Sequence, residues 1–514
     1  MAGLKGFSLH ALAALCGVSA LGLQKPLSGS EQLPIADGAS SPSSKKQLVD
    51  SDALQGTIRG DALLARAEEL YEIAKLSEDE YNRPTRVIGS AGHSGTLKYI
   101  HYALTALGDY YTLSKQPFPA FSGTVRQHQL VLGDKVLFDA QPMGLTPPTR
   151  DNEPVNGDLV LVANEGCEAS DYPSEVSGNI ALILRGTCPF GTKSERAGRA
   201  GALAAVVYNY ENESVSGTLG APSPDHVATF GLSGGDAAPY VKKLKNGEKV
   251  EATAFMDAEV KTIRTNNIIA QTVQGDPDNC VMLGGHSDSV SEGPGVNDDG
   301  SGSLALLEIA TQLTNFSVNN CVRFAWWSGE EEGLLGSNYY AENLPEEENM
   351  KIRLFMDYDM LASPNFAYQV YNATDDANPV GSEELRDLYI DWYTAHDLNY
   401  TLIEFDGRSD YDGFIRAGIP AGGIATGAEV KKTEEEEDMF GGRAGIPFDP
   451  CYHQSCDDVG NLNMTAWELN TKLVAHSVAT FAKSFEGFPN RTDALDAKAN
   501  KTKKGPYQGP KLIM

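Results

Sequence analysis

Short stretches in the second half of the chain combine histidine, asparagine and carboxylate side chains, which bind divalent cations in proteins. They span residues 286–288, 297–299, 330–332 and 357–359, and residues 452–457 add a second histidine far downstream. Each stretch is a weak signal by itself, because an acidic run is usually solvated and Asp-Asp-Gly usually forms a turn or a helix cap. Together they predict one site, since three of them directly follow an apolar run typical of a buried strand.

The acidic stretch 330–332 is informative because the apolar run Phe324–Trp327 comes just before it. Carboxylates so close to a buried strand cost free energy unless a counter-charge meets them. Two divalent cations would supply that counter-charge. The mixture of imidazole and carboxylate ligands suits zinc, with manganese or cobalt as substitutes.

Alternating strands and helices must position these stretches. In the second half of the chain, apolar runs alternate with amphipathic stretches, which indicates an α/β fold with a mostly parallel twisted sheet flanked by helices. Ligands in such folds bind at the carboxyl ends of the strands, where the polar stretches lie. The expected strands cover 267–273, 281–285, 322–327 and 354–359, and the expected helices cover 304–313 and 383–395.

Ahead of this region the sequence predicts two helices and a separate domain. Apolar residues at helical spacing predict a helix from Asp61, with Asp61 as its N-cap, and a second helix over 96–107. Residues 135–260 form a β-rich island with short strands between Gly, Pro and Asn turns. We expect this island to be inserted into a larger domain made of 53–134 and 261–488. Its expected strands are 159–163, 180–184 and 205–208, with one helix near 193–201.

The composition excludes several classes of protein. The 514 residues carry 70 acidic and 41 basic side chains, a formal net charge of −29. Such an excess repels a phosphate backbone, so we expect no nucleic-acid partner. Beyond the N-terminal leader there is no run of about 20 apolar residues, so we expect no membrane span.

The N-terminus has the features of an export signal, with a lysine, an apolar stretch and small residues before Ala20. We expect a signal peptide at 1–20 and a pro-segment or disordered linker at 21–52, with export either out of the cell or to a vacuole. The Lys-rich tail, 489–514, should be mobile. In an exported chain Asn-x-Ser/Thr motifs are glycosylation sites. They begin at Asn212, Asn315, Asn372, Asn399, Asn463, Asn490 and Asn500.

Six cysteines remain after removal of the leader, which contains the seventh. An even number in an exported chain suggests disulfides, although six cysteines allow fifteen pairings. Proximity along the chain favours Cys167–Cys188 and Cys451–Cys456, which leaves Cys280–Cys321 by elimination.

The polar stretches form five motifs in a fixed order: His286-x-Asp288, Asn297-Asp298-Asp299-Gly300, Glu330-Glu331-x-Gly333, Asp359-Met360-x-Ala362 and Tyr452-His453-x-x-Cys456. Their order and spacing resemble those of the co-catalytic zinc aminopeptidases of peptidase family M28. The likeness is closest to secreted or vacuolar fungal members of the family. These carry an inserted protease-associated (PA) domain, which the island at 135–260 would match.

The resemblance implies a site for two Zn²⁺ ions per chain. Asp298 would bridge both ions. His286 and Asp359 would complete one metal shell, and Glu331 and His453 would complete the other.

The resemblance also implies three catalytic residues. Glu330 would be the general base that takes a proton from the attacking water and later gives it to the leaving amine. Asp288 would accept a hydrogen bond from the imidazole of His286 and fix its orientation. Tyr452 would donate a hydrogen bond to the developing oxyanion.

Two points in this assignment have an alternative. The triple glutamate allows a second register, with Glu331 as base and Glu332 as ligand, although the following Gly333-Leu334 spacing favours the first. The loop 407–411 resembles the family's loop beside the pocket, but Arg408 and Asp410 could instead form a structural ion pair. In the family pattern the peptide bond after Asp298 is cis.

The resemblance implies a monomeric aminopeptidase of broad specificity that prefers apolar, leucine-type residues at peptide or protein N-termini. Glu330 and Asp359 would recognise the free α-amine. A carboxypeptidase of the same family is one alternative, but such enzymes add a long helical domain after the last motif. A non-catalytic binding protein of receptor type would have lost metal ligands, and a glutaminyl-cyclase-like single-zinc transferase would lack the PA insertion.

Overall fold

A computed structural model describes residues 46–212, 214–215, 217–374 and 377–491. The expected signal peptide, most of the expected linker, most of the tail and Asn500 lie outside these residues.

Parallel strands form the centre of the sheet in the C-terminal half, in the order β10–β9–β11–β14. The antiparallel strand β8 borders β10, and β12 pairs antiparallel with β14 and parallel with β13. This confirms the predicted α/β fold. The bounds are β8 Glu251–Thr272, β9 Asp276–His286, β10 Asn320–Trp327, β11 Ile352–Tyr358, β12 Gln369–Tyr371, β13 Thr401–Ile403 and β14 Ala421–Ala425.

Helices cover both faces of this sheet because its strands are apolar on both sides. Along β10, Phe324 and Trp326 join one core cluster, whereas Trp327 joins another, as expected when alternate side chains point to opposite faces. Residues of α2, α4, α7, α10 and α13 pack in the first cluster, and residues of α8 and α11 pack in the second. The bounds are α1 Ser51–Gln55, α2 Gly60–Ala74, α3 Glu78–Tyr81, α4 Ala91–Thr105, α7 Gly300–Leu313, α8 Leu335–Glu342, α9 Glu346–Lys351, α10 Ser382–Ala395, α11 Tyr411–Arg416, α12 Glu434–Phe440 and α13 Met464–Lys483.

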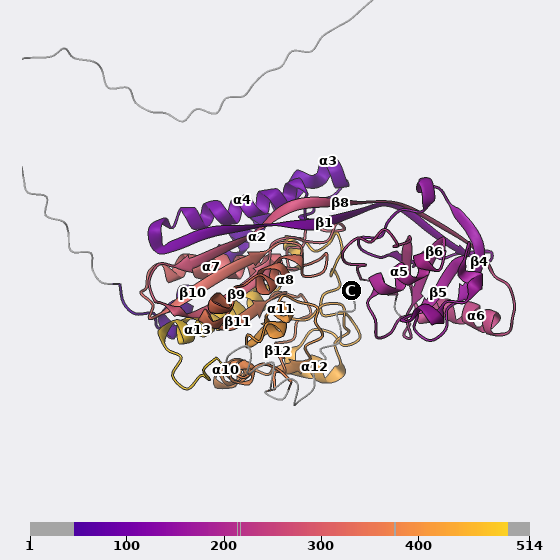
Figure 1. The fold of residues 1–514 in the computed structure, drawn as a ribbon. Coiled ribbons are helices and arrows are strands. Elements are labelled where there is room, and N and C mark those ends of the chain that lie inside the picture. The colour runs from indigo at the N-terminus through magenta and orange to yellow at the C-terminus, as the bar shows by residue number, and fades with distance from the viewer. Residues whose placement is uncertain (1–45, 213, 216, 375–376, 492–514) are drawn as a thin grey trace, which may run out of the picture. The chain divides into compact units, whose positions relative to one another are not determined.

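A long antiparallel ribbon of β1 (Tyr111–Leu132) and β8 is the most extended feature of the fold (Figure 1). Tyr111 pairs with Thr272 at one end and Leu132 with Ala252 at the other, with one bulge near Val125. The predicted domain boundary at 260 lies inside β8, because the strand continues through it.

The β-rich island contains four parallel strands, in the order β4–β5–β6–β7, with β3 antiparallel at the edge. Two core clusters lie within it, made mainly of aliphatic side chains. Its expected helix begins earlier than predicted, directly after Pro189. The bounds are β2 Lys135–Val136, β3 Gln141–Pro142, β4 Val155–Leu161, β5 Ile180–Leu184, β6 Ala204–Tyr208, β7 Thr229–Leu232, α5 Phe190–Arg199 and α6 Gly234–Lys245.

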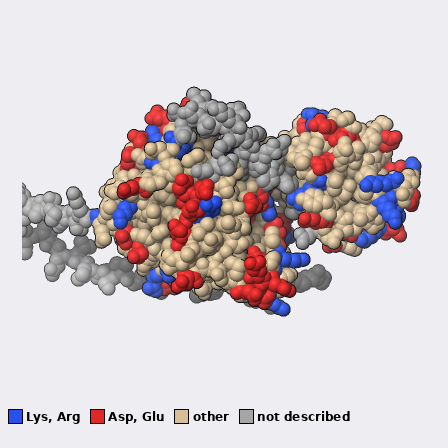
Figure 2. Space-filling view, turned by 90° about the horizontal axis from the view of Figure 1, so that it is seen from below, with Lys and Arg blue, Asp and Glu red and all other residues tan. Residues whose placement is uncertain are grey.

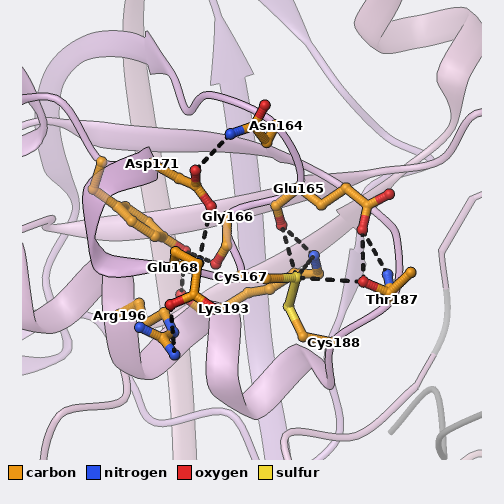
Figure 3. The surroundings of a disulfide bond; sticks show 11 residues. Asn164, Glu165, Gly166, Cys167, Glu168, Asp171, Thr187, Cys188, Lys193 and Arg196 are labelled. Atoms are coloured by element: carbon orange, nitrogen blue, oxygen red, sulfur yellow. Dashed lines mark hydrogen bonds and ion pairs between the residues drawn. A yellow bond between two sulfur atoms is a disulfide. The ribbon is translucent and has the colours of Figure 1, made fainter.

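All three expected disulfides are present: Cys167–Cys188, Cys280–Cys321 and Cys451–Cys456. Figure 3 shows the first of them beside Lys193, whose buried ammonium lies 3.8 Å from the Cys167 sulfur. The ammonium also donates to the backbone oxygen of Glu165. The disulfide and this lysine therefore join the loop 164–168 to α5.

Both ends of the described chain pack more closely than the sequence predicts. Residues 46–52 were expected to be linker, yet Val49 is fully buried and Leu48 forms a bridge with Ser317. Arg491, at the start of the expected mobile tail, donates to the backbone oxygens of Asn349 and Ile352. These segments lack strong helical or strand periodicity, so nothing in their own sequence indicates that they pack against the domain.

Two helix starts also differ from the prediction. The N-cap of α2 is Arg59, and Asp61 lies in its first turn, where it pairs with Arg59 at 2.7 Å. The next long helix, α4, begins at Ala91 because the Ser90 side chain caps it by accepting from the His93 N–H.

Acidic side chains form several groups on the face that Figure 2 presents, in line with the net charge. Among the residues described, no helix combines the length and hydropathy needed to cross a bilayer. Of the expected glycosylation sites, Asn372 and Asn463 are half-buried. Four others are exposed: Asn212, Asn315, Asn399 and Asn490.

Candidate metal centre

Side chains from five separated stretches meet where the parallel strands end. His286 is the last residue of β9, Glu331 follows β10, and Asp359 follows β11. Because these strands are parallel neighbours, their carboxyl ends share one edge of the sheet. Asp298 comes from the loop before α7, and His453 comes from the loop before α13.

Asp298 lies between the two histidines. Its Oδ1 is 3.2 Å from Nε2 of His286, and its Oδ2 is 3.2 Å from Nε2 of His453. The side chain is almost fully buried. One carboxylate therefore presents a separate oxygen to each imidazole.

Each histidine also faces a second carboxylate. Nε2 of His286 is 3.8 Å from Oδ1 of Asp359, and Nε2 of His453 is 3.0 Å from Oε2 of Glu331. The result is two His–carboxylate groups that share Asp298. Potential ligand atoms of His286, Asp298 and Glu331 all lie within 4.8 Å of one another.

Burial and charge oppose each other strongly in this cluster. Burial alone would lower the pKa of His453, but the carboxylates of Glu331 and Asp298 hold it well above its usual value. Burial raises the pKa of Asp359 to about 7, against the attraction of His286. The protein groups by themselves thus leave buried carboxylates that favour a proton or another cation.

The donor set fits divalent cations. Two acceptor atoms, Oε1 of Glu331 and Oδ1 of Asp359, are buried and have no hydrogen-bond donor among the described residues. Buried acceptors of this kind usually have a partner. Two imidazole nitrogens and several carboxylate oxygens at short range suit zinc or similar transition-metal ions.

The structure separates the three adjacent glutamates. Glu331 faces His453, while Oε2 of Glu330 lies 3.9 Å from Nε2 of His286. Glu332 instead faces the backbone of Gly123, and burial raises its pKa to about 8. This arrangement supports the register in which Glu330 and Glu331, and not Glu332, serve the site.

Asp288 does not orient His286 by the expected hydrogen bond, since its Oδ1 lies 3.9 Å from Nδ1 of the ring. Nδ1 has no hydrogen-bond partner among the described residues. Asp288 instead accepts from the backbone N–H groups of Gly329 at 2.7 Å and Glu330 at 3.3 Å. Asp288 therefore fixes the backbone of the turn that carries the glutamates. The N–H groups of this turn lie closer to its carboxylate than the imidazole of His286 does.

Asp299 acts on the backbone around the site. Its carboxylate accepts from the N–H groups of His286, Gly302 and Met360, and it caps the N-terminus of α7. The peptide bond between Asp298 and Asp299 is cis, as in the family pattern.

Tyr452 stacks on His453, with ring centroids 3.8 Å apart, and its hydroxyl accepts from Arg408 at 3.2 Å. Arg408 also pairs with Glu429 at 2.8 Å. Arg408 and Asp410 do not form the suggested ion pair, because Asp410 is buried whereas Arg408 is half-exposed and pairs with Glu429.

A network of polar side chains holds the loop that carries His453. Asp457, after the Cys451–Cys456 disulfide, accepts from the backbone N–H groups of Asn297 and Asp298. Asn461 donates to Asp457 and to Asp449, each at 3.0 Å. The network thus connects both ends of this loop to the loop that carries Asp298.

We expect replacement of Asn461 by alanine to destabilise the protein by about 1–3 kcal/mol, because two buried carboxylates lose a shared donor. Burial and the carboxylate of Asp449 already raise the pKa of Asp457 to about 8. Urea unfolding would measure the change. Asn319→Ala, which removes an exposed hydrogen bond to the backbone of Lys483, is the matched control and should cost less.

Sequence reasoning missed some residues that shape the site. Asn461 and Asp449 lie outside the motifs, and only the proximity of polar residues to the second histidine hinted at them. Arg86, which binds the loop after His286, lies in a segment without any chemical motif.

Two family models match the chain. One is peptidase family M28, over residues 267–478, and the other is the PA domain, over residues 155–239.

Known relatives extend the similarity to most of the chain. It is 51% identical over 456 residues to Aminopeptidase Y of Saccharomyces cerevisiae, covering 87% of this chain and 83% of that protein. It is 42% identical over 450 residues to Leucine aminopeptidase 2 of Trichophyton equinum, covering 87% and 89%. A solved aminopeptidase from Aneurinibacillus sp. strain AM-1 superposes with a TM-score of 0.69 and 25% identity, covering 86% and 98%.

Proposed function

The chain belongs to peptidase family M28, and from this premise we propose that it is a metallo-aminopeptidase with a preference for leucine-type N-terminal residues. It hydrolyses the first peptide bond of peptides or proteins that have a free α-amine. The observation that carries the proposal is Asp298, which presents one oxygen to each of two histidines at 3.2 Å.

Zinc is the metal of this site, and we propose two ions per chain. Asp298 would bind both, His286 and Asp359 would hold one, and Glu331 and His453 would hold the other. This division follows from the two His–carboxylate groups and from the buried oxygens of Glu331 and Asp359 that lack donors. When bound, the ions would polarise the scissile carbonyl and lower the pKa of the attacking water.

Glu330 supplies the proton transfers. Burial, together with the carboxylates of Glu331 and Asp359, raises its pKa well above the usual value, although His286 opposes this. The bound cations would counter this rise and keep the carboxylate ionised, as a general base requires. It takes a proton from water as the oxygen attacks the carbonyl carbon, and delivers that proton to the amine nitrogen when the C–N bond breaks.

Tyr452 and Asp288 support this chemistry. The Tyr452 hydroxyl accepts from Arg408, which leaves its own proton free to bond the oxyanion that develops on the carbonyl oxygen. Asp288 holds the backbone of the glutamate turn, so that Glu330 and Glu331 keep their separate directions. Glu330 and Asp359 are the carboxylates available to the substrate's α-ammonium group.

We propose further that the enzyme is an exported monomer, with its signal peptide at 1–20. The peptidase domain is made of 53–134 and 261–488, and the inserted PA domain spans 135–260. The PA match over 155–239 supports the inserted domain, whereas β8 continues through its C-terminal boundary at 260. Likeness to proteins named aminopeptidases over 87% of the chain favours this function over the carboxypeptidase and receptor alternatives.

The test is hydrolysis of leucine p-nitroanilide by the full protein. We expect activity that a chelator abolishes and that added zinc restores, with zinc bound per chain measured by mass spectrometry. An N-acetylated substrate should not be cleaved, because it lacks the free amine. Cleavage of N-blocked peptides from the C-terminus would instead support the carboxypeptidase alternative.

A further inference from the structure

Arg86 is a fully buried arginine, and within the described residues its guanidinium donates hydrogen bonds only to backbone oxygens. Its guanidinium bonds the carbonyls of Ser287 at 2.5 Å, Pro294 at 2.8 Å and Gly295 at 2.5 Å. A planar guanidinium presents several N–H groups in fixed directions, which lysine does not. It therefore joins three points of one loop.

That loop connects two of the proposed metal ligands. It follows His286 at the end of β9 and reaches Asp298 shortly before α7 begins, with no helix or strand between. The backbone N–H of Arg86 also donates to Ser289 at 2.9 Å, and the Thr85 hydroxyl donates to the oxygen of Val290 at 2.7 Å. The segment 85–86 thus contacts the loop along much of its length.

The charge of Arg86 also bears on the site. Burial lowers its pKa, but Asp288, Asp299 and Asp457 oppose this and favour the charged form. The hydrogen bonds of the guanidinium go to backbone oxygens, so these carboxylates act on its charge without bonding to it. The positive charge therefore offsets a group of buried carboxylates while its N–H groups hold the backbone.

We propose that Arg86 is a positioning residue that sets the loop 287–298 before metal binds, so that His286 and Asp298 already stand 3.2 Å apart. The inference rests on the proposed metal function. If a loop adopts its binding conformation in only a fraction of the molecules, the apparent affinity for the ligand is reduced by that fraction. Arg86 would remove that loss.

The test compares Arg86→Lys with the wild-type protein. The lysine keeps the charge but cannot join three carbonyls, so we expect zinc affinity, measured by competition with a chromophoric chelator, to fall by about 10- to 100-fold. As zinc is raised, leucine p-nitroanilide turnover should approach the wild-type value with an unchanged KM. A residue needed only for general stability would not give this zinc-dependent recovery.

Arg491→Lys is the matched control. Arg491 also donates to backbone oxygens, those of Asn349 and Ile352, but at the opposite end of β11 from the site. We expect it to leave zinc affinity unchanged. If Arg86→Lys does not fold, Ser289→Ala removes one contact of the same segment and should weaken zinc binding in the same direction.

The inference would be overturned if Arg86→Lys, or Ser289→Ala in its place, bound zinc as tightly as Arg491→Lys does. So would a loss of turnover that persists at saturating zinc. A wild-type protein that binds no zinc would contradict the proposed function itself, which is a separate result.

Discussion

Glu330→Gln should lower turnover by about 10²- to 10⁴-fold, because the amide cannot accept the proton that the base must take from water. Zinc content should not change, since Glu331 and not Glu330 faces His453. The substitution keeps the size of a side chain that is only 9% exposed. Steady-state kinetics and metal analysis of the same preparation would measure both quantities.

Glu332→Gln is the control for this prediction. Glu332 is 7% exposed and lies two positions along, but it faces Gly123, and its pKa of about 8 keeps it protonated near neutral pH. Glutamine resembles that protonated form, so activity should stay close to wild type. If Glu330→Gln lost zinc while Glu332→Gln lost turnover, the assignment of base and ligand would be wrong.

Asp298→Asn should cost the protein both its metal and its activity. One carboxylate oxygen faces each histidine, and an amide can offer only one acceptor oxygen and no charge. Replacing an outer partner of a metal ligand typically lowers metal affinity by about 10- to 100-fold, and a shared ligand should exceed that. Chelator competition and zinc analysis would measure the loss.

Asp171→Asn is the matched control. Asp171 is 6% exposed, close to the 5% of Asp298, and accepts from Asn164 and the Glu168 backbone in the β-rich island (Figure 3). Its replacement should leave zinc content unchanged. Wild-type zinc affinity in Asp298→Asn would contradict a shared ligand.

The sequence predicts the central strands well because their signal is local. Continuous apolar runs mark β9, β10 and β11 within a few residues, since strands buried on both faces need no polar alternation. Helix starts are harder. The sequence predicts Asp61 as an N-cap, but Arg59 occupies that position and Asp61 pairs with it from the first turn, a shift of the size common at helix ends.

For the site as well, residues marked by their own neighbours in the sequence are predictable, whereas contacts between distant segments are not. His286, Glu331 and Asp359 are foreseeable because each lies at or just after the end of a strand, whereas His453 stands out only as a polar residue far downstream with no strand before it. Asp288 was assigned to the imidazole, whereas the fold turns it toward the backbone of Gly329. Such contacts depend on how loops meet in space, which spacing along the chain does not encode.

The ribbon of β1 and β8 has a consequence for how such a chain can change over generations. Leu132 and Ala252 are paired neighbours, so the chain leaves and re-enters the ribbon at adjacent points. When the two ends of an insertion lie next to each other, the strands that flank it keep the same path with or without it. The β-rich module is thus placed where it could be gained, lost or exchanged while the histidine and carboxylate cluster keeps its geometry.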